Sequence, residues 1–219
     1  MSFDMIYTNI INNNKMKLIT TTIPDDVNNI INRYVENTKP TIYDEWNDGI
    51  WNRLFGSKPD MNRGLYKSIP FNKTTILSNE LNFIKNIAYD LLINAGFKIS
   101  YDEGMIHIDI FDMETENRTP TRYMIGCDND ISDMYFETCV FYTRKDVNVI
   151  GDLDYYTVPP TLFTNVDPNV LETKSNLVVL RNGDMHYRIQ DHSGYGKENI
   201  ISVHFRTLDP QYNTEGFLF

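Results

Sequence analysis

The feature that most constrains the fold of this chain is a series of strand-like segments that fills its second half. Some alternate apolar and polar residues and others are rich in β-branched and aromatic residues, and both patterns are typical of β-strands. The segments are "MIHIDIFDM" (105–113), "RYMIGC" (122–127), "FETCVFYTRKD" (136–146), "GDLDYYTVP" (151–159), "NLVVLRNGD" (176–184) and "NIISVHFRT" (199–207). With helical segments before them, they predict a mainly β (α+β) protein, a sandwich or jelly-roll barrel braced by N-terminal helices.

Two helices are predicted ahead of the strands. The segment "SNELNFIKNIAYDLLINAG" (78–96) opens with a capping residue, Ser78 or Asn79, carries one apolar stripe and ends at a glycine. The segment "PDDVNNIINRYVENTKP" (24–40) has apolar residues near helical spacing between its two prolines. Both tryptophans fall in "YDEWNDGIWNRLFG" (43–56), which we expect to form a cap over the core.

A chain of 219 residues is long enough to bury one full core, so we expect a single domain over residues 1–219. The first 75 residues mix short helical and irregular signals, and we expect them to form an N-terminal cap with helices. Residues 76–219 are then expected to hold one helix and the jelly-roll core.

Composition indicates which partners and which cellular compartment to expect for the protein. Thirty acidic against twenty basic residues give a formal charge of −10, which argues against broad, nonspecific binding to a phosphate backbone but leaves room for a local basic pocket. The two cysteines, Cys127 and Cys139, lack the spacing of a disulfide framework or a zinc site, which favours a reducing compartment. No run of eighteen apolar residues occurs, so we expect a soluble, cytoplasmic protein without membrane contact. The many Asn, Ile, Lys and Tyr residues are expected of an AT-rich genome, such as that of a large DNA virus or a protist.

His107 and Asp109 are the first candidates for chemistry. The period of two along 105–113 puts both on one strand face and three isoleucines on the other. If the isoleucines face the helices, the imidazole and the carboxylate face the barrel interior. Such a pair can give two ligands to one metal ion, and with a distant histidine it forms the triad typical of Fe(II) oxygenases. The alternative is a polar strand face in contact with water.

Taken in order, residues 78 to 206 resemble the 2-oxoglutarate and Fe(II)-dependent dioxygenases, most closely their prolyl-hydroxylase-like branch. The resemblance lies in the order and spacing of several pieces, and no single piece is specific. After the helix and the first strand they are "RYMIGCDND" (122–130), the tyrosine-bearing "ETCVFYTRKDVNVIGDLDYY" (137–156), "NGDMHYRI" (182–189) and Lys197 ahead of "NIISVHFR" (199–206).

The resemblance implies a double-stranded β-helix that binds Fe(II) and 2-oxoglutarate. In that family a His-x-Asp pair and a distal histidine hold the metal, and a Lys or Arg on the penultimate strand holds the far carboxylate of the cosubstrate. His186 fits the distal ligand, and Lys197, eleven residues later, fits the cation. A cation is required there because the cosubstrate is a dianion that loses its water on binding. For the proximal His-x-Asp pair, a literal register takes His107 and Asp109.

A second register for the proximal ligands fits the expected topology better. It takes Asp128, which lies fourteen residues before Tyr142, and it matches Tyr123 to a catalytic tyrosine that contacts the cosubstrate, as Tyr142 also would. The histidine position of the family then falls on Gly126, which has no side chain to bind a metal. In this register His107 lies on the preceding strand and is a candidate for the missing imidazole.

The cation site shows a second departure. If residues 201–203 are aligned directly with the last strand of the family, the basic position falls on Glu198 and not on Lys197. A carboxylate there repels 2-oxoglutarate. The glycine-rich "HSGYGK" (192–197) permits a shift of one residue, so both alignments stay open at the level of sequence.

Three functions follow from these patterns. The first is an active dioxygenase that hydroxylates a protein side chain or a nucleobase. The second is a pseudoenzyme that uses an aromatic pocket and a carboxylate to bind a ligand, such as a modified base, a nucleotide or a peptide. The third is a structural jelly-roll protein. His192 and His204 are interpreted as core or surface histidines in all three.

Overall fold

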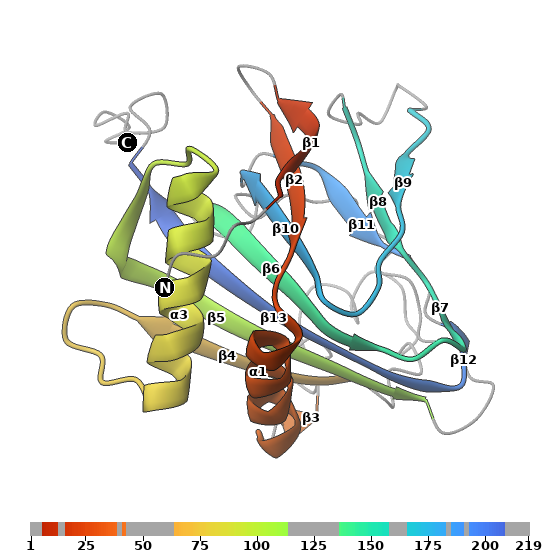
Figure 1. Cartoon of the computed structure of the whole chain (residues 1–219), viewed down its shortest axis with the longest axis horizontal. Coiled ribbons are helices and arrows are strands. Elements are labelled where there is room, and N and C mark those ends of the chain that lie inside the picture. The colour runs from red at the N-terminus through yellow and green to blue at the C-terminus, as the bar shows by residue number, and fades with distance from the viewer. Residues whose placement is uncertain are drawn as a thin grey trace, which may run out of the picture.

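An eight-stranded antiparallel sheet, the main sheet, forms the centre of the fold (Figure 1). The computed structural model describes residues 6–12, 16–38, 41–42, 64–113, 136–157, 166–182, 185–190 and 193–208. The strands of the main sheet are, in spatial order, β1 (Thr8–Asn12), β2 (Lys17–Thr22), β10 (Leu177–Asn182), β6 (Phe136–Lys145), β13 (Gly196–Thr207), β5 (Ile99–Met113), β4 (Gly64–Phe71) and β3 (Thr41–Ile42).

A smaller sheet and a short ribbon complete the strands. The small sheet has three strands, β11 (Tyr187–Ile189), β8 (Leu153–Tyr155) and β9 (Asn169–Leu171), and the ribbon pairs β12 (Ser193–Gly194) with β7 (Val149–Ile150). Chain connections pass repeatedly between the main sheet and the small sheet, as in a jelly roll. The mainly β jelly-roll class predicted from the sequence is confirmed.

Two helices lie on one face of the main sheet, which we call the outer face (Figure 1). They are α1 (Asp25–Asn37) and α3 (Asn79–Asn94). The predicted start of α3 is confirmed, because the Ser78 hydroxyl accepts a hydrogen bond from the Leu81 N–H at 3.3 Å. The glycine that follows α3, Gly96, has a φ of +80°, which lets the chain leave the helix.

The outer face is covered by a continuous apolar core. Ile106 and Ile108 of β5 are fully buried there and share one cluster with Ile31 of α1 and Ile84 of α3. The prediction that the isoleucines of β5 face the helices is therefore confirmed. It follows from strand alternation that His107 and Asp109 lie on the opposite face of the main sheet.

That opposite face, which we call the inner face, carries a second apolar cluster. It is built from residues of β2, β6, β10 and β13 together with Leu153 of the small sheet, while Tyr155 and Tyr187 pack against it. The fully or largely buried members of this inner cluster are Met16, Leu18, Val140, Tyr142, Leu153, Leu177, Val179, Met185 and Ile200.

The N-terminal segment holds the predicted helix, as α1, together with strands that the sequence does not indicate. In the described residues before residue 75, four strands form and extend the main sheet at both edges. β1 pairs with β2, and β3 with β4. β3 has two residues and β4 contains Gly64 and Pro70, so their own patterns are weak, whereas β2 is rich in β-branched residues and pairs with β10. Residues 43–56, with both tryptophans, lie outside the described residues.

No helix in the described parts of the chain is long and apolar enough to cross a bilayer.

Ile108→Ala tests the outer core. Ile108 is fully buried, so we expect the truncation to lower the free energy of unfolding by about 2–5 kcal/mol, measured by urea denaturation. Ile76→Ala is the matched control, because Ile76 is 96% exposed and its truncation is expected to change stability little. Equal effects of the two substitutions would contradict the assigned core.

Candidate functional site

A polar zone occupies the inner face where β5 and β13 lie side by side. His107 is paired with Ser202, and Asp109 with Ile200, in the antiparallel ladder between these strands. Asp109 is 9% exposed, and Phe111 packs against the inner cluster. A buried carboxylate is costly unless it is hydrogen-bonded or paired.

Two histidines meet in this zone. The ring centroids of His107 and His204 are 4.6 Å apart, and Thr138 Oγ1 lies 3.0 Å from Nδ1 of His204. Cross-strand pairing explains the contact, because His204 and His107 are diagonal neighbours on β13 and β5. The sequence analysis treats His204 as a core or surface residue and does not predict its contact with His107.

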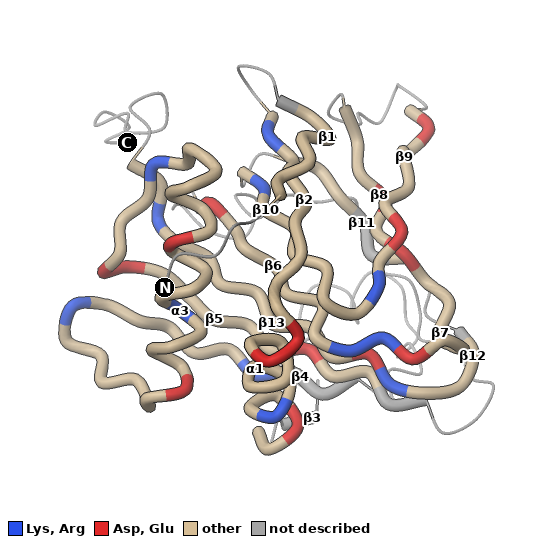
Figure 2. The backbone as a smooth tube through the Cα atoms, in the orientation of Figure 1, with Lys and Arg blue, Asp and Glu red and all other residues tan. Residues whose placement is uncertain are grey.

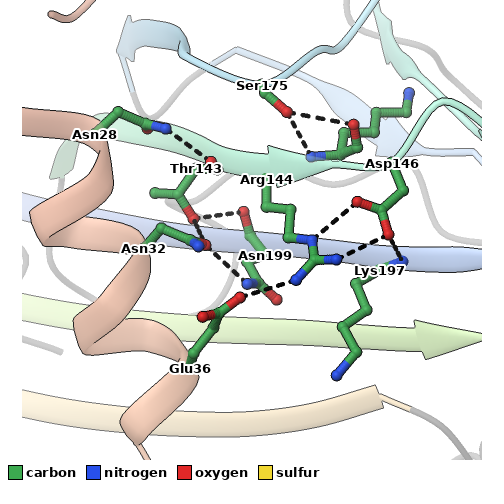
Figure 3. Close-up of polar contacts among 10 residues, drawn as sticks. Asn28, Asn32, Glu36, Thr143, Arg144, Asp146, Ser175, Lys197 and Asn199 are labelled. Carbon is green, nitrogen blue, oxygen red and sulfur yellow. Dashed lines mark hydrogen bonds and ion pairs between the residues drawn. The ribbon is translucent and has the colours of Figure 1, made fainter. Parts of the chain in front are cut away.

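Glu198 lies on the inner face at the start of β13. Ile200 belongs to the inner cluster and Ile201 to the outer core, so alternation puts Glu198 inward. Glu198 is fully buried and faces Phe111 across the ladder with β5. Lys197 is one residue out of phase, and it lies with Asp146 on the outer face (Figure 3).

A second lysine stands beside Glu198. Lys145 is opposite Glu198 in the β13–β6 ladder and directs its ammonium group toward the small sheet. Its Nζ lies 2.9 Å from Asp152 Oδ1 and 2.7 Å from the Thr173 hydroxyl. Charges of both signs therefore meet where β6 ends and β13 begins (Figure 2). The ammonium group next to Glu198 is thus already bonded to another carboxylate.

Arg181 is the buried cation at the other end of the inner face. It is 4% exposed at the end of β10, where it pairs with Thr138 of β6. Its guanidinium carbon lies 3.7 Å from the ring centroid of Tyr187 on β11, a cation–π contact. Sequence reasoning missed Arg181, although an arginine in phase with Leu177 and Val179 along an apolar strand is a readable signal.

Tyr142 lies between these charged groups. Burial raises the pKa of its phenol above the ordinary value, and the carboxylate of Glu198 raises it further, while Arg181 lowers it. Both charges therefore act on the Tyr142 hydroxyl. Tyr142 is a member of the inner cluster. The sequence analysis predicts that it contacts the cosubstrate, and that role stays a prediction.

His186 lies directly before β11 of the small sheet. Its carbonyl accepts the Tyr156 N–H at 3.0 Å, continuing the ladder in which Tyr187 faces Tyr155. Tyr155 and Tyr187 both pack against the inner cluster. The role of His186 as the distal metal ligand stays a prediction.

The remaining predicted site residues, Tyr123 and Asp128, lie outside the described residues, as does Gly126. Within the described ranges, no group of three or more His, Cys, Asp or Glu side chains is arranged to hold a metal ion. In the same ranges, the inner face carries a buried carboxylate, Glu198, as well as a buried cation, Arg181.

Comparison with known proteins identifies the fold. A prolyl hydroxylase of Trichoplax adhaerens, solved with a peptide fragment of the hypoxia inducible factor oxygen degradation domain, is 14% identical, with a TM-score of 0.54 over 92% of this chain and 86% of that one. HygX of Streptomyces hygroscopicus, solved with nickel and 2-oxoglutarate, is 9% identical, with a TM-score of 0.56 over 89% of this chain and 84% of that one.

No family model and no curated protein matches the sequence. At these identities the two likenesses establish a shared architecture. The chain therefore has the jelly-roll fold of the 2-oxoglutarate oxygenases, and its function has to be argued from its own residues.

Tyr142→Phe tests the electrostatics of the inner face. A phenol whose pKa is raised by folding stabilises the fold below its unfolded value near pH 10, and this stabilisation is lost as pH rises toward the folded value. We therefore expect the fall in unfolding free energy between about pH 9 and about pH 11 to be smaller in Tyr142→Phe than in the native protein. Identical falls in the two proteins would show that Tyr142 does not feel this environment.

Proposed function

We propose that the protein is a catalytically inactive relative of the jelly-roll oxygenases, which binds a ligand with a cationic or base-like group on its inner face. The observation that carries this proposal is the fully buried Glu198 on the inner side of β13, with Lys197 on the outer side. A buried carboxylate attracts a cation and repels an anion more strongly than an exposed one does.

The neighbours of Glu198 support this choice of ligand. Asp109 adds a second carboxylate on the same face, diagonal to Glu198 across the β5–β13 ladder, at a typical spacing of about 7–8 Å. Phe111 and Tyr142 supply aromatic rings nearby, and such rings favour cations and stacked bases. Lys145, opposite Glu198 on β6, bonds Asp152 at 2.9 Å.

The cosubstrate of the oxygenases has the opposite charge. Its far carboxylate would meet Glu198, so we expect no 2-oxoglutarate turnover. The measurement is succinate release by the full chain with Fe(II), ascorbate and each of two substrate classes, a proline peptide and a methylated oligonucleotide. Succinate formation above the uncoupled background would disprove the proposed inactivity.

A cationic probe tests the proposed ligand class directly. We expect butylammonium to raise the melting temperature in a concentration-dependent manner, and butyrate to leave it unchanged, because only a ligand bound to the folded state stabilises it. Glu198→Gln keeps the shape and removes the charge, so it should weaken butylammonium binding by about tenfold or more.

Glu172→Gln is the matched control for this experiment. Glu172 is exposed and follows β9, and its substitution removes the same charge from the whole molecule. An equal effect of Glu172→Gln and Glu198→Gln would assign the binding to net charge alone and would count against a site at Glu198.

One observation favours a second candidate, an active oxygenase that hydroxylates a protein side chain or a nucleobase with Fe(II) and 2-oxoglutarate. Arg181 is a buried cation on the inner face, and its guanidinium is of the kind that pairs with carboxylates. The peptide bound to the Trichoplax adhaerens enzyme supports a protein substrate for this candidate. If succinate release is found, its loss in Arg181→Gln would assign the cosubstrate to Arg181.

A further inference from the structure

A polar network on the outer face joins α1 to the residues on either side of Glu198 (Figure 3). We call this network the outer clamp. It has an amide arm, formed by Asn32, Thr143 and Asn199, and a charged arm, formed by Glu36, Arg144 and Asp146.

The amide arm fixes the residue after Glu198. The side-chain amide of Asn199 donates to Asn32 Oδ1 at 2.8 Å, and the Thr143 hydroxyl lies 3.1 Å from the same oxygen. The Thr143 hydroxyl is also 3.1 Å from the backbone carbonyl oxygen of Asn199. Asn32 Oδ1 of α1 therefore contacts a side chain of β6, Thr143, and a side chain of β13, Asn199.

The charged arm fixes the residue before Glu198. The Lys197 N–H donates to Asp146 Oδ2 at 3.0 Å, and the Asp146 N–H donates to the Lys197 carbonyl at 3.0 Å. Arg144 binds the Asp146 carboxylate through two nitrogens, at 2.9 and 3.1 Å, and reaches Glu36 of α1 at 3.0 Å. Arg144 also holds the pKa of the Asp146 carboxyl below its usual range.

A β-bulge makes both arms possible. The pairing of β13 with β6 shifts between Asn199 and Ile200, so that Ile200 faces Tyr142 whereas Asn199 faces Arg144. Thr143 is the extra residue, and the bulge lets Thr143 and Arg144 both address the outer face. In a regular ladder the two would point to opposite faces.

We propose that the outer clamp is the device that turns Glu198, and not Lys197, toward the inner face, and that Asn32 is its principal positioning residue. The amide arm holds the Asn199 side chain on the outer face and the charged arm bonds the Lys197 backbone, so Glu198 between them points inward. A slip of one residue in this stretch would exchange the carboxylate for the Lys197 ammonium group. The helix α1 thereby determines the sign of charge on a site that it does not touch.

Burial ranks the two arms. Thr143 and Asn199 are 3% and 0% exposed, so their hydrogen bonds are shielded from water. The Arg144 and Glu36 side chains are 36% and 43% exposed, and an ion pair in that setting is largely screened. The amide arm therefore contributes more to the register than the charged arm does.

The effect of the clamp on the charge of the bound ligand rests on the proposed function. The role of the clamp in positioning residue 198 does not. The following experiment tests the positioning role separately from ligand binding. A thiol is introduced at the inner site by Glu198→Cys, or at a second inner position of β13 by Ser202→Cys. Alkylation by iodoacetamide is followed for each thiol by peptide-resolved mass spectrometry, which reads the two native cysteines separately.

Adding Asn32→Ala should speed alkylation at position 198 by about tenfold or more and change the rate at position 202 by less than about twofold, because only the local segment is released. Asn29→Ala is the matched control, since Asn29 is an exposed asparagine on the same helix, and it should change neither rate. Should Asn32→Ala not fold, Thr143→Val removes the clamp hydroxyl with little change in shape and should act in the same direction.

Unchanged protection at position 198, or an equal rise at 198 and 202, would overturn the proposal, because the network would then be an ordinary part of the packing. A protein that fails to bind butylammonium yet shows the selective rise would retain the clamp and lose the proposed function.

Discussion

The structure depends on the alternation of side chains along β13. This strand lies in the middle of the main sheet, between β6 and β5, and both of its faces are buried. Ile201, Val203 and Phe205 enter the outer core, so the residues in the other phase must enter the inner face. A slip of one residue would bury the wrong set on both sides at once, which makes the register costly to change.

This constraint gives the inner face its chemistry. The same phase that buries Ile200 also buries Glu198, and it sets His204 against His107 of β5. Alternation along β10 also puts Arg181 on the inner face, in phase with Leu177 and Val179 and opposite Thr138 of β6. The outcome is a face with an apolar cluster on β2, β10 and β6 and a polar zone on β5 and β13. The fold is that of the oxygenases, and the inward-facing residue at the start of β13 is an acid, Glu198.

Local patterns predicted much of this arrangement. Ser78 and Gly96 marked the ends of α3, and the period of two in 105–113 put His107 and Asp109 on the face away from the helices, where the structure has them. Those features depend on short-range rules of capping and alternation, which are readable in a single sequence.

Features that depend on long-range pairing were not readable. The N-terminal strands take their form from the neighbours they pair with, and the contact between His107 and His204 joins residues almost a hundred positions apart. The choice between Lys197 and Glu198 depends on the phase in which β13 pairs with β5 and β6, which no local pattern announces. Tyr123 and Asp128, which carry the second register, fall outside the described residues and stay predictions.

The most direct test of the account is calorimetric titration of 2-oxoglutarate into the native protein with Fe(II) under anaerobic conditions. The account predicts no saturable heat of binding, because the buried carboxylate of Glu198 on the inner face repels a dianion. Saturable binding with one site per chain would contradict it and would identify the protein as a cosubstrate-binding oxygenase.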